Sequence, residues 1–256
     1  MIRAEMTKYF RTRLFWVLNG LGLALLTAYS LAMAGMARVG LMPVTAFEYL
    51  IAANNTYVML LLPLLVLLFS AHVFASEYRW RTMMIPIVAG MRRATIVWNK
   101  VTLCGLTTLC FVGVYLVGSM GFAFTLFPAQ DMRLEGHTLS IGEVIGRMVA
   151  AMGWTTLIIF LFGLLTMVLV AALRNTVLAA VGSFLAFIGL MMSSGAKYNP
   201  FAPLLRVTNA FVQVADLTTP DIGLLLLKGS GVWLVAFTVI IVVLLESFRR
   251  QDIVLE

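Results

Sequence analysis

The chain has 256 residues, of which 62% are hydrophobic and only 11% are charged, with a net charge of +7 and a mean hydropathy of +1.01. A soluble domain carries roughly a quarter charged residues, so this composition excludes an ordinary soluble protein and makes lipid the solvent for most of the surface. The positive charge alone would allow nucleic-acid binding. However, no Lys/Arg run with interleaved aromatic residues lies on a plausible soluble domain, which argues against that class.

Residues 1–13 predict a short amphipathic helix in the cytoplasmic membrane interface. Ile2, Met6, Tyr9 and Phe10 recur at helical spacing, whereas the charged residues fall mainly elsewhere around the helix. A floating basic tail is the alternative.

Six apolar segments of about 20 residues predict an all-α polytopic membrane protein with six transmembrane helices. The first segment is too long for the apolar core of a signal peptide, so we expect a transmembrane helix. The fifth is short and is expected to begin near Asn175. The predicted spans are Leu14–Ala34, Tyr57–Ser76, Val101–Phe124, Met148–Leu173, Val177–Met192 and Lys228–Leu245.

The distribution of basic residues predicts that both termini are cytoplasmic. With this N-in/C-in orientation, the cytoplasmic segments carry the entire net charge of +7 and the outer segments are neutral overall. The charge therefore indicates topology and contact with anionic lipid, and we expect no nucleic-acid partner.

Two outer loops differ in kind. Pro128–Gly146 looks like an ordinary polar loop, whereas Ser193–Leu227 is longer and partly apolar. Within the longer loop, residues 199–220 predict a short helix that lies on or re-enters the outer leaflet before the last span. Asn209 and Gln213 would share one face of this helix. Its apolar positions at helical spacing include Phe201, Leu204, Leu205, Phe211 and Val212.

The sequence contains no catalytic or metal-binding constellation. The only histidines, His72 and His137, fall on opposite sides of the predicted membrane. The 16 methionines could suit Cu(I), but no methionine ladder is joined to His or Cys, so a packing role is expected. No G-x-x-x-x-G-K-[ST] phosphate loop occurs, and the spans lack buried acidic or basic residues. We expect a chain that is not itself an enzyme and that would borrow energy for any uphill transport.

The predicted spans contain a proline, two cysteines and several polar residues. Pro63 is expected to kink the second span. Cys104 and Cys110 are six residues apart on one predicted helix and cannot form a disulfide with each other. The side chains that can form hydrogen bonds between helices are Asn19, Thr107, Thr108, Thr155 and Thr156.

The segment between the second and third spans exposes apolar residues among charges. Glu77 and Arg81 have i, i+4 spacing and can pair, and Trp80 suits the membrane interface. Five apolar residues follow on the cytoplasmic side: Met83, Met84, Ile85, Ile87 and Val88. Burying each is worth roughly 1.5–3 kcal/mol at most, so they must pack on the bilayer, on the helix ends or on a second protein.

This segment resembles the permease subunits of ABC-2 type transporters. Their pattern places an acidic residue after the second span, then Thr, an apolar stretch with Pro, an Arg, and a Lys that opens the third span. The matching residues here are Glu77, Thr82, Pro86, Arg92 or Arg93, and Lys100, with Arg81 where the family often has Gly. The resemblance extends over the whole chain, from the interfacial helix through six spans to the C-terminal Arg249-Arg250.

The resemblance implies a bacterial exporter of the cytoplasmic membrane, with residues 14–256 as one permease domain. A second permease chain, identical or related, would complete the pathway for a hydrophobic or amphipathic substrate such as a drug, an antibiotic peptide or a lipid-like molecule. Residues 77–99 would couple to a separate cytoplasmic ATPase that binds ATP and Mg²⁺, and this chain would bind no cofactor. The implied coupling residues are Glu77, Arg81, Thr82, Met83, Met84, Ile85, Pro86, Ile87 and Val88.

The resemblance also implies an outer gate within residues 193–227, formed by Phe201, Leu205, Asn209, Phe211 and Gln213. Two alternatives stay open. The chain could be a membrane assembly or sensory subunit that binds an ATPase without transporting anything, or it could be an intramembrane enzyme.

Overall fold

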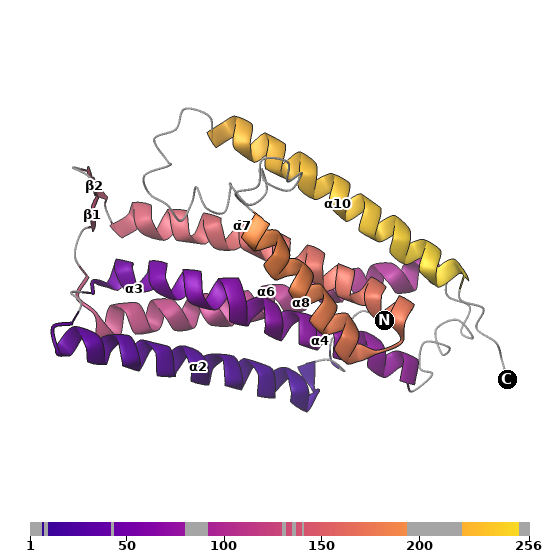
Figure 1. Ribbon diagram of the computed structural model, residues 1–256, viewed down its shortest axis with the longest axis horizontal. Coiled ribbons are helices and arrows are strands. Elements are labelled where there is room, and N and C mark those ends of the chain that lie inside the picture. The colour runs from indigo at the N-terminus through magenta and orange to yellow at the C-terminus, as the bar shows by residue number, and fades with distance from the viewer. Residues whose placement is uncertain are drawn as a thin grey trace.

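The computed structural model describes residues 7, 10–41, 44–79, 92–129, 132–134, 137–139, 141–193 and 222–250. In this part of the chain the architecture is all-helical apart from one two-stranded hairpin (Figure 1). The elements are α2 (Arg13–Arg38), α3 (Ala46–Ala53), the π-helix η1 (Asn54–Leu61), α4 (Leu62–Arg79), α6 (Arg93–Leu126), β1 (Met132–Leu134), β2 (His137–Leu139), α7 (Ile141–Leu173), α8 (Thr176–Met192) and α10 (Ile222–Arg250).

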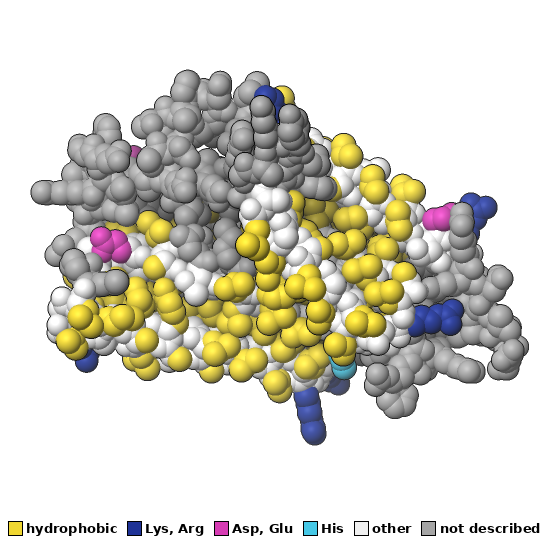
Figure 2. Space-filling model, viewed as in Figure 1, with side chains coloured by type: hydrophobic (Ala, Val, Ile, Leu, Met, Phe, Trp, Pro, Cys, Tyr) yellow, Lys and Arg dark blue, Asp and Glu magenta, His cyan; other side chains and the backbone are white. Residues whose placement is uncertain are grey.

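Four helices in the described part of the chain are long and apolar enough to cross a membrane. They are α2, α6, α7 and α10, and two shorter apolar helices, Leu62–Ala75 and Thr176–Met192, accompany them. Figure 2 shows hydrophobic side chains over the middle of the visible face, with Lys and Arg side chains mostly at its margins. The chain therefore has the helix set and the surface of a helical membrane protein.

Several helices extend beyond the predicted spans. Helix α6 begins at Arg93 rather than Val101, α7 begins at Ile141, and α10 occupies residues 222–250. A hydropathy window registers only the apolar part of a helix, whereas the backbone hydrogen bonds continue through its polar flanks. As a result, residues 77–79 and 93–99 of the predicted coupling loop are helical, and residues 222–227 of the predicted outer segment belong to α10.

The predicted polar loop Pro128–Gly146 also contains regular structure. Strands β1 and β2 pair antiparallel, with Met132 opposite Leu139 and Leu134 opposite His137. The predicted polar loop thus includes a short hairpin, and its residues from Ile141 onward belong to α7. The alternation of the hairpin is too short, at three residues a strand, to stand out from its polar surroundings.

The second predicted span is part of a longer helical run that comprises α3, η1 and α4. Thr45 opens it with a capping box, in which the Thr45 N–H donates to Glu48 Oε2 at 2.8 Å and the Glu48 N–H donates to Thr45 Oγ1 at 3.3 Å. At the end of η1, the Leu62 N–H donates to the Tyr57 carbonyl. Pro63 follows at once and has no N–H to donate. Where the sequence predicts a kink, the structure places a π-helical segment directly before the proline.

The connection between α7 and α8 is very short. Arg174 has a positive φ of 51°, and the Asn175 side chain accepts hydrogen bonds from the backbone N–H groups of Val177 at 3.0 Å and Leu178 at 3.1 Å. Asn175 thus satisfies two of the free N–H groups at the start of α8. The helix that corresponds to the predicted fifth span therefore begins next to Asn175, at Thr176.

Helix α7 lies at the centre of the packing. It contacts α4, α6, α8 and α10, while α2 packs against α6 and α4 on the other side. The crossing of α7 with α6 is tight, because a Cβ added to Gly163 would lie 2.8 Å from Cys104 Sγ. Cys104 and Cys110 are both free thiols, as their spacing predicts.

The residues that the sequence singles out for possible hydrogen bonds between helices bond within their own helices instead. Each of these side chains donates to a carbonyl of its own helix, such as Thr156 Oγ1 to Met152 O at 2.6 Å. A hydroxyl in a helix lies close to the carbonyl one turn earlier, which is therefore its nearest acceptor. The same holds for Asn19, Thr107, Thr108 and Thr155. Among the described residues, side-chain hydrogen bonds between helices involve Tyr49, Tyr57 and the Ser70–Cys104 pair. Trp233 forms another, in which Nε1 donates to Leu157 O at 3.0 Å.

Candidate functional site

The helix ends that flank the predicted coupling segment meet at one end of the bundle. Helix α4 ends and α6 begins there, together with the start of α2, the α7–α8 corner and the end of α10 (Figure 1). Basic residues at these helix ends are Arg13, Arg79, Arg92, Arg93, Arg174, Arg249 and Arg250. The helices thus bring to one end seven of the basic residues that the sequence analysis assigns to the cytoplasm.

Most of the predicted site residues lie outside the described part of the chain. Glu77 belongs to the last turns of α4. The other coupling residues lie outside it, namely Arg81, Thr82, Met83, Met84, Ile85, Pro86, Ile87 and Val88. The same is true of the outer-gate residues Phe201, Leu205, Asn209, Phe211 and Gln213.

Lys100, the last residue of the ABC-2-like pattern, is buried. Its side chain is only 2% exposed, and it lies on α6 beside the buried residues Val97, Val101 and Cys104. The expectation that the spans contain no buried charge therefore needs correction. Helix α6 begins before the predicted third span, and Lys100 is buried in this added part of the helix. An ionisable residue buried in a membrane bundle is costly and is by default a functional candidate.

The described residues offer little for metal chemistry. No three His, Cys, Asp or Glu side chains among them are grouped so that they could hold a metal ion. His72, which lies near the end of α4, is exposed.

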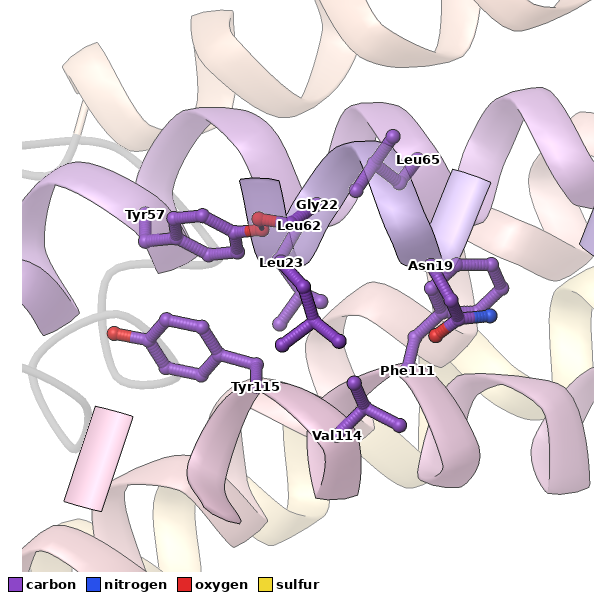
Figure 3. Close-up of a pocket in the computed structure, with 9 residues that line it drawn as sticks. All are labelled: Asn19, Gly22, Leu23, Tyr57, Leu62, Leu65, Phe111, Val114 and Tyr115. Carbon is purple, nitrogen blue, oxygen red and sulfur yellow. Dashed lines mark hydrogen bonds between the residues drawn. The ribbon is translucent and has the colours of Figure 1, made fainter. Parts of the chain in front are cut away.

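The most distinctive arrangement of polar groups lies inside the bundle, in a cleft between α2, η1–α4 and α6 (Figure 3). We call it the tyrosine cleft. Leu23 and Val114 at its rim are 38% and 37% exposed, so the cleft opens between α2 and α6 towards the lipid-facing surface. The residues that line it are Asn19, Gly22 and Leu23 of α2, Tyr57, Leu62 and Leu65 of η1–α4, and Phe111, Val114 and Tyr115 of α6.

Two stacked tyrosines form one end of the cleft. The rings of Tyr57 and Tyr115 lie with centroids 4.5 Å apart at an interplanar angle of 17°. Figure 3 shows their hydroxyls pointing in opposite directions. The Tyr57 hydroxyl donates to the Gly22 carbonyl and ties η1 to α2. Position 22 needs glycine here, because an added Cβ would lie 2.8 Å from that hydroxyl oxygen.

Buried polar atoms in and beside the cleft have no hydrogen-bond partner among the described residues. They are Asn19 Oδ1, Tyr115 Oη and, nearby on η1, Asn54 Oδ1. Asn19 is 7% exposed and Tyr115 is 2% exposed. Leaving a buried acceptor or donor unsatisfied costs about 1–3 kcal/mol of free energy. A bound molecule that formed the missing hydrogen bond would recover part of this cost.

The polar character continues from the cleft towards the α2–α3 connection. The ring of Tyr49 on α3 lies beside that of Tyr29 on α2, with centroids 6.2 Å apart. The Tyr49 hydroxyl in turn lies 2.5 Å from Ser30 Oγ on α2. One tyrosine pair therefore links α2 to α3, and the other links η1 to α6, within an otherwise apolar bundle.

Sequence reasoning missed this cleft. It treats Tyr57 as the apolar start of a span and gives Tyr115 no role, and it expects Asn19 only to link helices. The available signal was the clustering of Asn54, Asn55 and Tyr57 before Pro63, which is typical of an irregular, polar helix segment. Nothing in the sequence paired that segment with Tyr115.

Comparison with known proteins adds a family but no activity. Residues 23–254 match a family described as "Protein of unknown function (DUF2705)". The match runs from α2 to the end of α10. A comparison with curated proteins gives no match.

Proposed function

The chain belongs to the DUF2705 family, and we propose that it is the permease subunit of an ATP-binding-cassette exporter in the bacterial cytoplasmic membrane. It would form half of the translocation pathway, with a second permease chain as the other half. A cytoplasmic ATPase would bind ATP and Mg²⁺ and drive transport of a hydrophobic or amphipathic substrate.

The observation that carries the proposal is the segment from Glu77 to Lys100. It joins the end of α4 to the start of α6, at the end of the bundle where the basic helix ends gather. Its apolar run includes Met83, Met84 and Ile85 and needs a surface to cover it. A groove on an ATPase subunit supplies such a surface.

Two further observations support this reading. Lys100, the residue that closes the ABC-2-like pattern, is buried at the start of α6 rather than solvated as an ordinary loop charge. The sequence also contains no phosphate loop, so an ATP-driven role requires the ATPase as a separate chain. In this proposal all six apolar helices cross the bilayer, both termini are cytoplasmic, and residues 193–221 contain the outer gate.

The first test is co-purification of this chain with a cytoplasmic ABC-type ATPase from the same organism. Met84→Glu places a charge in the apolar run and is expected to reduce the recovered ATPase at least about tenfold, because a buried unpaired charge is strongly unfavourable. Met84→Leu keeps the apolar surface and serves as the matched control, with recovery unchanged. Glu77→Ala is expected to uncouple transport while the protein stays folded. Equal ATPase recovery and equal transport in all variants would refute the coupling role.

The second test separates transport from an assembly or sensory role. The purified complex in liposomes is expected to show ATP-dependent accumulation of an amphipathic fluorescent dye, with ATPase activity that rises with the dye concentration. A complex that binds the ATPase normally but moves no dye, drug, peptide or lipid would favour the non-transport alternative.

A further inference from the structure

The tyrosine cleft combines apolar walls with an acceptor that has no partner among the described residues. Its lining contains no charged residue: Leu23, Leu62, Leu65, Phe111 and Val114 supply hydrocarbon, and the two tyrosines supply ring faces. A charged group would be desolvated there without a counter-ion. The cleft therefore selects for an uncharged ligand.

The Asn19 side chain fixes which chemical group this ligand must offer. Its Nδ2 donates to the Phe15 carbonyl at 2.9 Å, so its oxygen is left to accept. That oxygen lies on the Phe111 side of the amide in Figure 3 and has no partner among the residues that the structure describes. The matching group is an O–H or N–H donor.

The position of the cleft indicates the route of entry. Its rim residues Leu23 and Val114 are partly exposed on the apolar surface between α2 and α6. The cleft itself has room for only a small polar group, so the apolar remainder of a ligand would lie along the rim in contact with lipid. One wall is formed by η1, and π-helical segments are frequent at functional sites because they free backbone and side chains from regular packing.

We propose that the tyrosine cleft is a binding site for uncharged amphipathic molecules that enter from the bilayer and donate a hydroxyl or amide hydrogen bond to Asn19 Oδ1. The site does not depend on an ATPase, because all of its residues belong to this chain.

Photolabelling of the full chain in phosphatidylcholine vesicles tests the proposal. The probe is hexadecanol with a diazirine next to the hydroxyl end, and its methyl ether is the control that lacks the donor. The alcohol is expected to label the α2 and α6 peptides around the cleft about five- to tenfold more than the ether, which is the usual value of one hydrogen bond. Equal labelling by both probes would mean ordinary lipid contact, or a cleft filled by water alone, and would overturn the proposal.

Three variants locate the effect. Asn19→Leu removes the acceptor at similar volume and is expected to abolish the difference between alcohol and ether. Val114→Trp narrows the rim with Asn19 intact and should lower labelling by the alcohol. This variant therefore still tests the binding site if Asn19→Leu fails to fold. Ser183→Ala removes another buried unpartnered hydroxyl, on α8 and outside the cleft, and should change nothing. Labelling that is insensitive to both Asn19→Leu and Val114→Trp would overturn the assignment.

Unlabelled competitors then distinguish the source of the ligand. Competition by diacylglycerol would indicate a membrane lipid with a free hydroxyl, and competition by an acylated dipeptide amide would indicate a peptide-like cargo. Either result supports the site, and failure of both competitors at saturating concentration would contradict it. Because binding is measured on this chain alone, failure here leaves the ATPase test untouched, and the reverse is also true.

Discussion

Helices α7 and α10 are both long and apolar, yet the chain buries them very differently. Of the most apolar stretch of each helix, 56% is buried in α7 and only 17% in α10. Lipid tails are as apolar as leucine, so hydrophobicity does not decide which helix lies inside a membrane bundle. Small residues and residues with a hydroxyl group decide this instead, because they allow close packing. Helix α7 packs Gly163, Thr155 and Thr166 against its neighbours. Helix α10 instead exposes large aliphatic side chains, among them Leu234, Val235, Val239 and Val242.

The largest expected effect tests the buried side of this comparison. Phe187 of α8 is fully buried and packs edge-on against Phe162 of α7, with ring centroids 5.3 Å apart. Phe187→Ala is expected to lower the free energy of unfolding by about 3–5 kcal/mol, because it leaves a cavity. Reversible unfolding in mixed micelles measures this. Leu185→Ala on the same helix, where Leu185 is 62% exposed, is the control and should cost less than about 1 kcal/mol.

The next effect concerns the close approach of α7 and α6. Gly163→Val would force a side chain against Cys104 Sγ and is expected to destabilise the protein by about 1–3 kcal/mol. Gly153→Val, on the same helix at a position where nothing lies within 4 Å of an added Cβ, should be nearly neutral. Equal unfolding midpoints for the two variants would show that α7 is not the tightly packed helix described above.

A smaller effect is expected from the bond between η1 and α2. Tyr57→Phe removes the hydrogen bond to the Gly22 carbonyl, and such bonds in membrane bundles are worth about 0.6 kcal/mol on average, with a maximum near 1.7. Thr238→Val on α10 removes only a bond to the carbonyl of its own helix, at an exposed position. The difference in unfolding free energy between these variants compares the two sides of the bundle directly.

The smallest effect is expected on α10 itself. Val235→Ala combined with Val239→Ala should change the unfolding free energy of the isolated chain by less than about 0.5 kcal/mol, because both residues are more than half exposed. A loss above about 1 kcal/mol in micelles would instead mean that another copy of the chain covers α10 under those conditions.

The sequence predicts the membrane class and the approximate position of the helices, because a long apolar segment in lipid satisfies its backbone hydrogen bonds as a helix. It also predicts the start of α8, because an Asn cap has a local mechanism. It does not predict where α6, α7 and α10 begin, or that α10 continues to Arg250, since polar flanks carry no hydropathy signal. The tyrosine cleft could not be predicted, because Tyr57 and Tyr115 belong to different spans and only their packing brings the rings together.

In the proposed six-span topology, the short helix α8 has a consequence for the surrounding bilayer. Its 17 residues extend about 26 Å, while a typical hydrocarbon layer is roughly 30 Å thick. Figure 1 shows that α8 also crosses α7 obliquely, which reduces the thickness it can cover. A helix that is too short is accommodated by local thinning of the lipid, at a fraction of a kcal/mol per Å. The stability of this protein should therefore depend on acyl-chain length, with shorter-chain lipids favoured, and α8 would be the element that senses the difference.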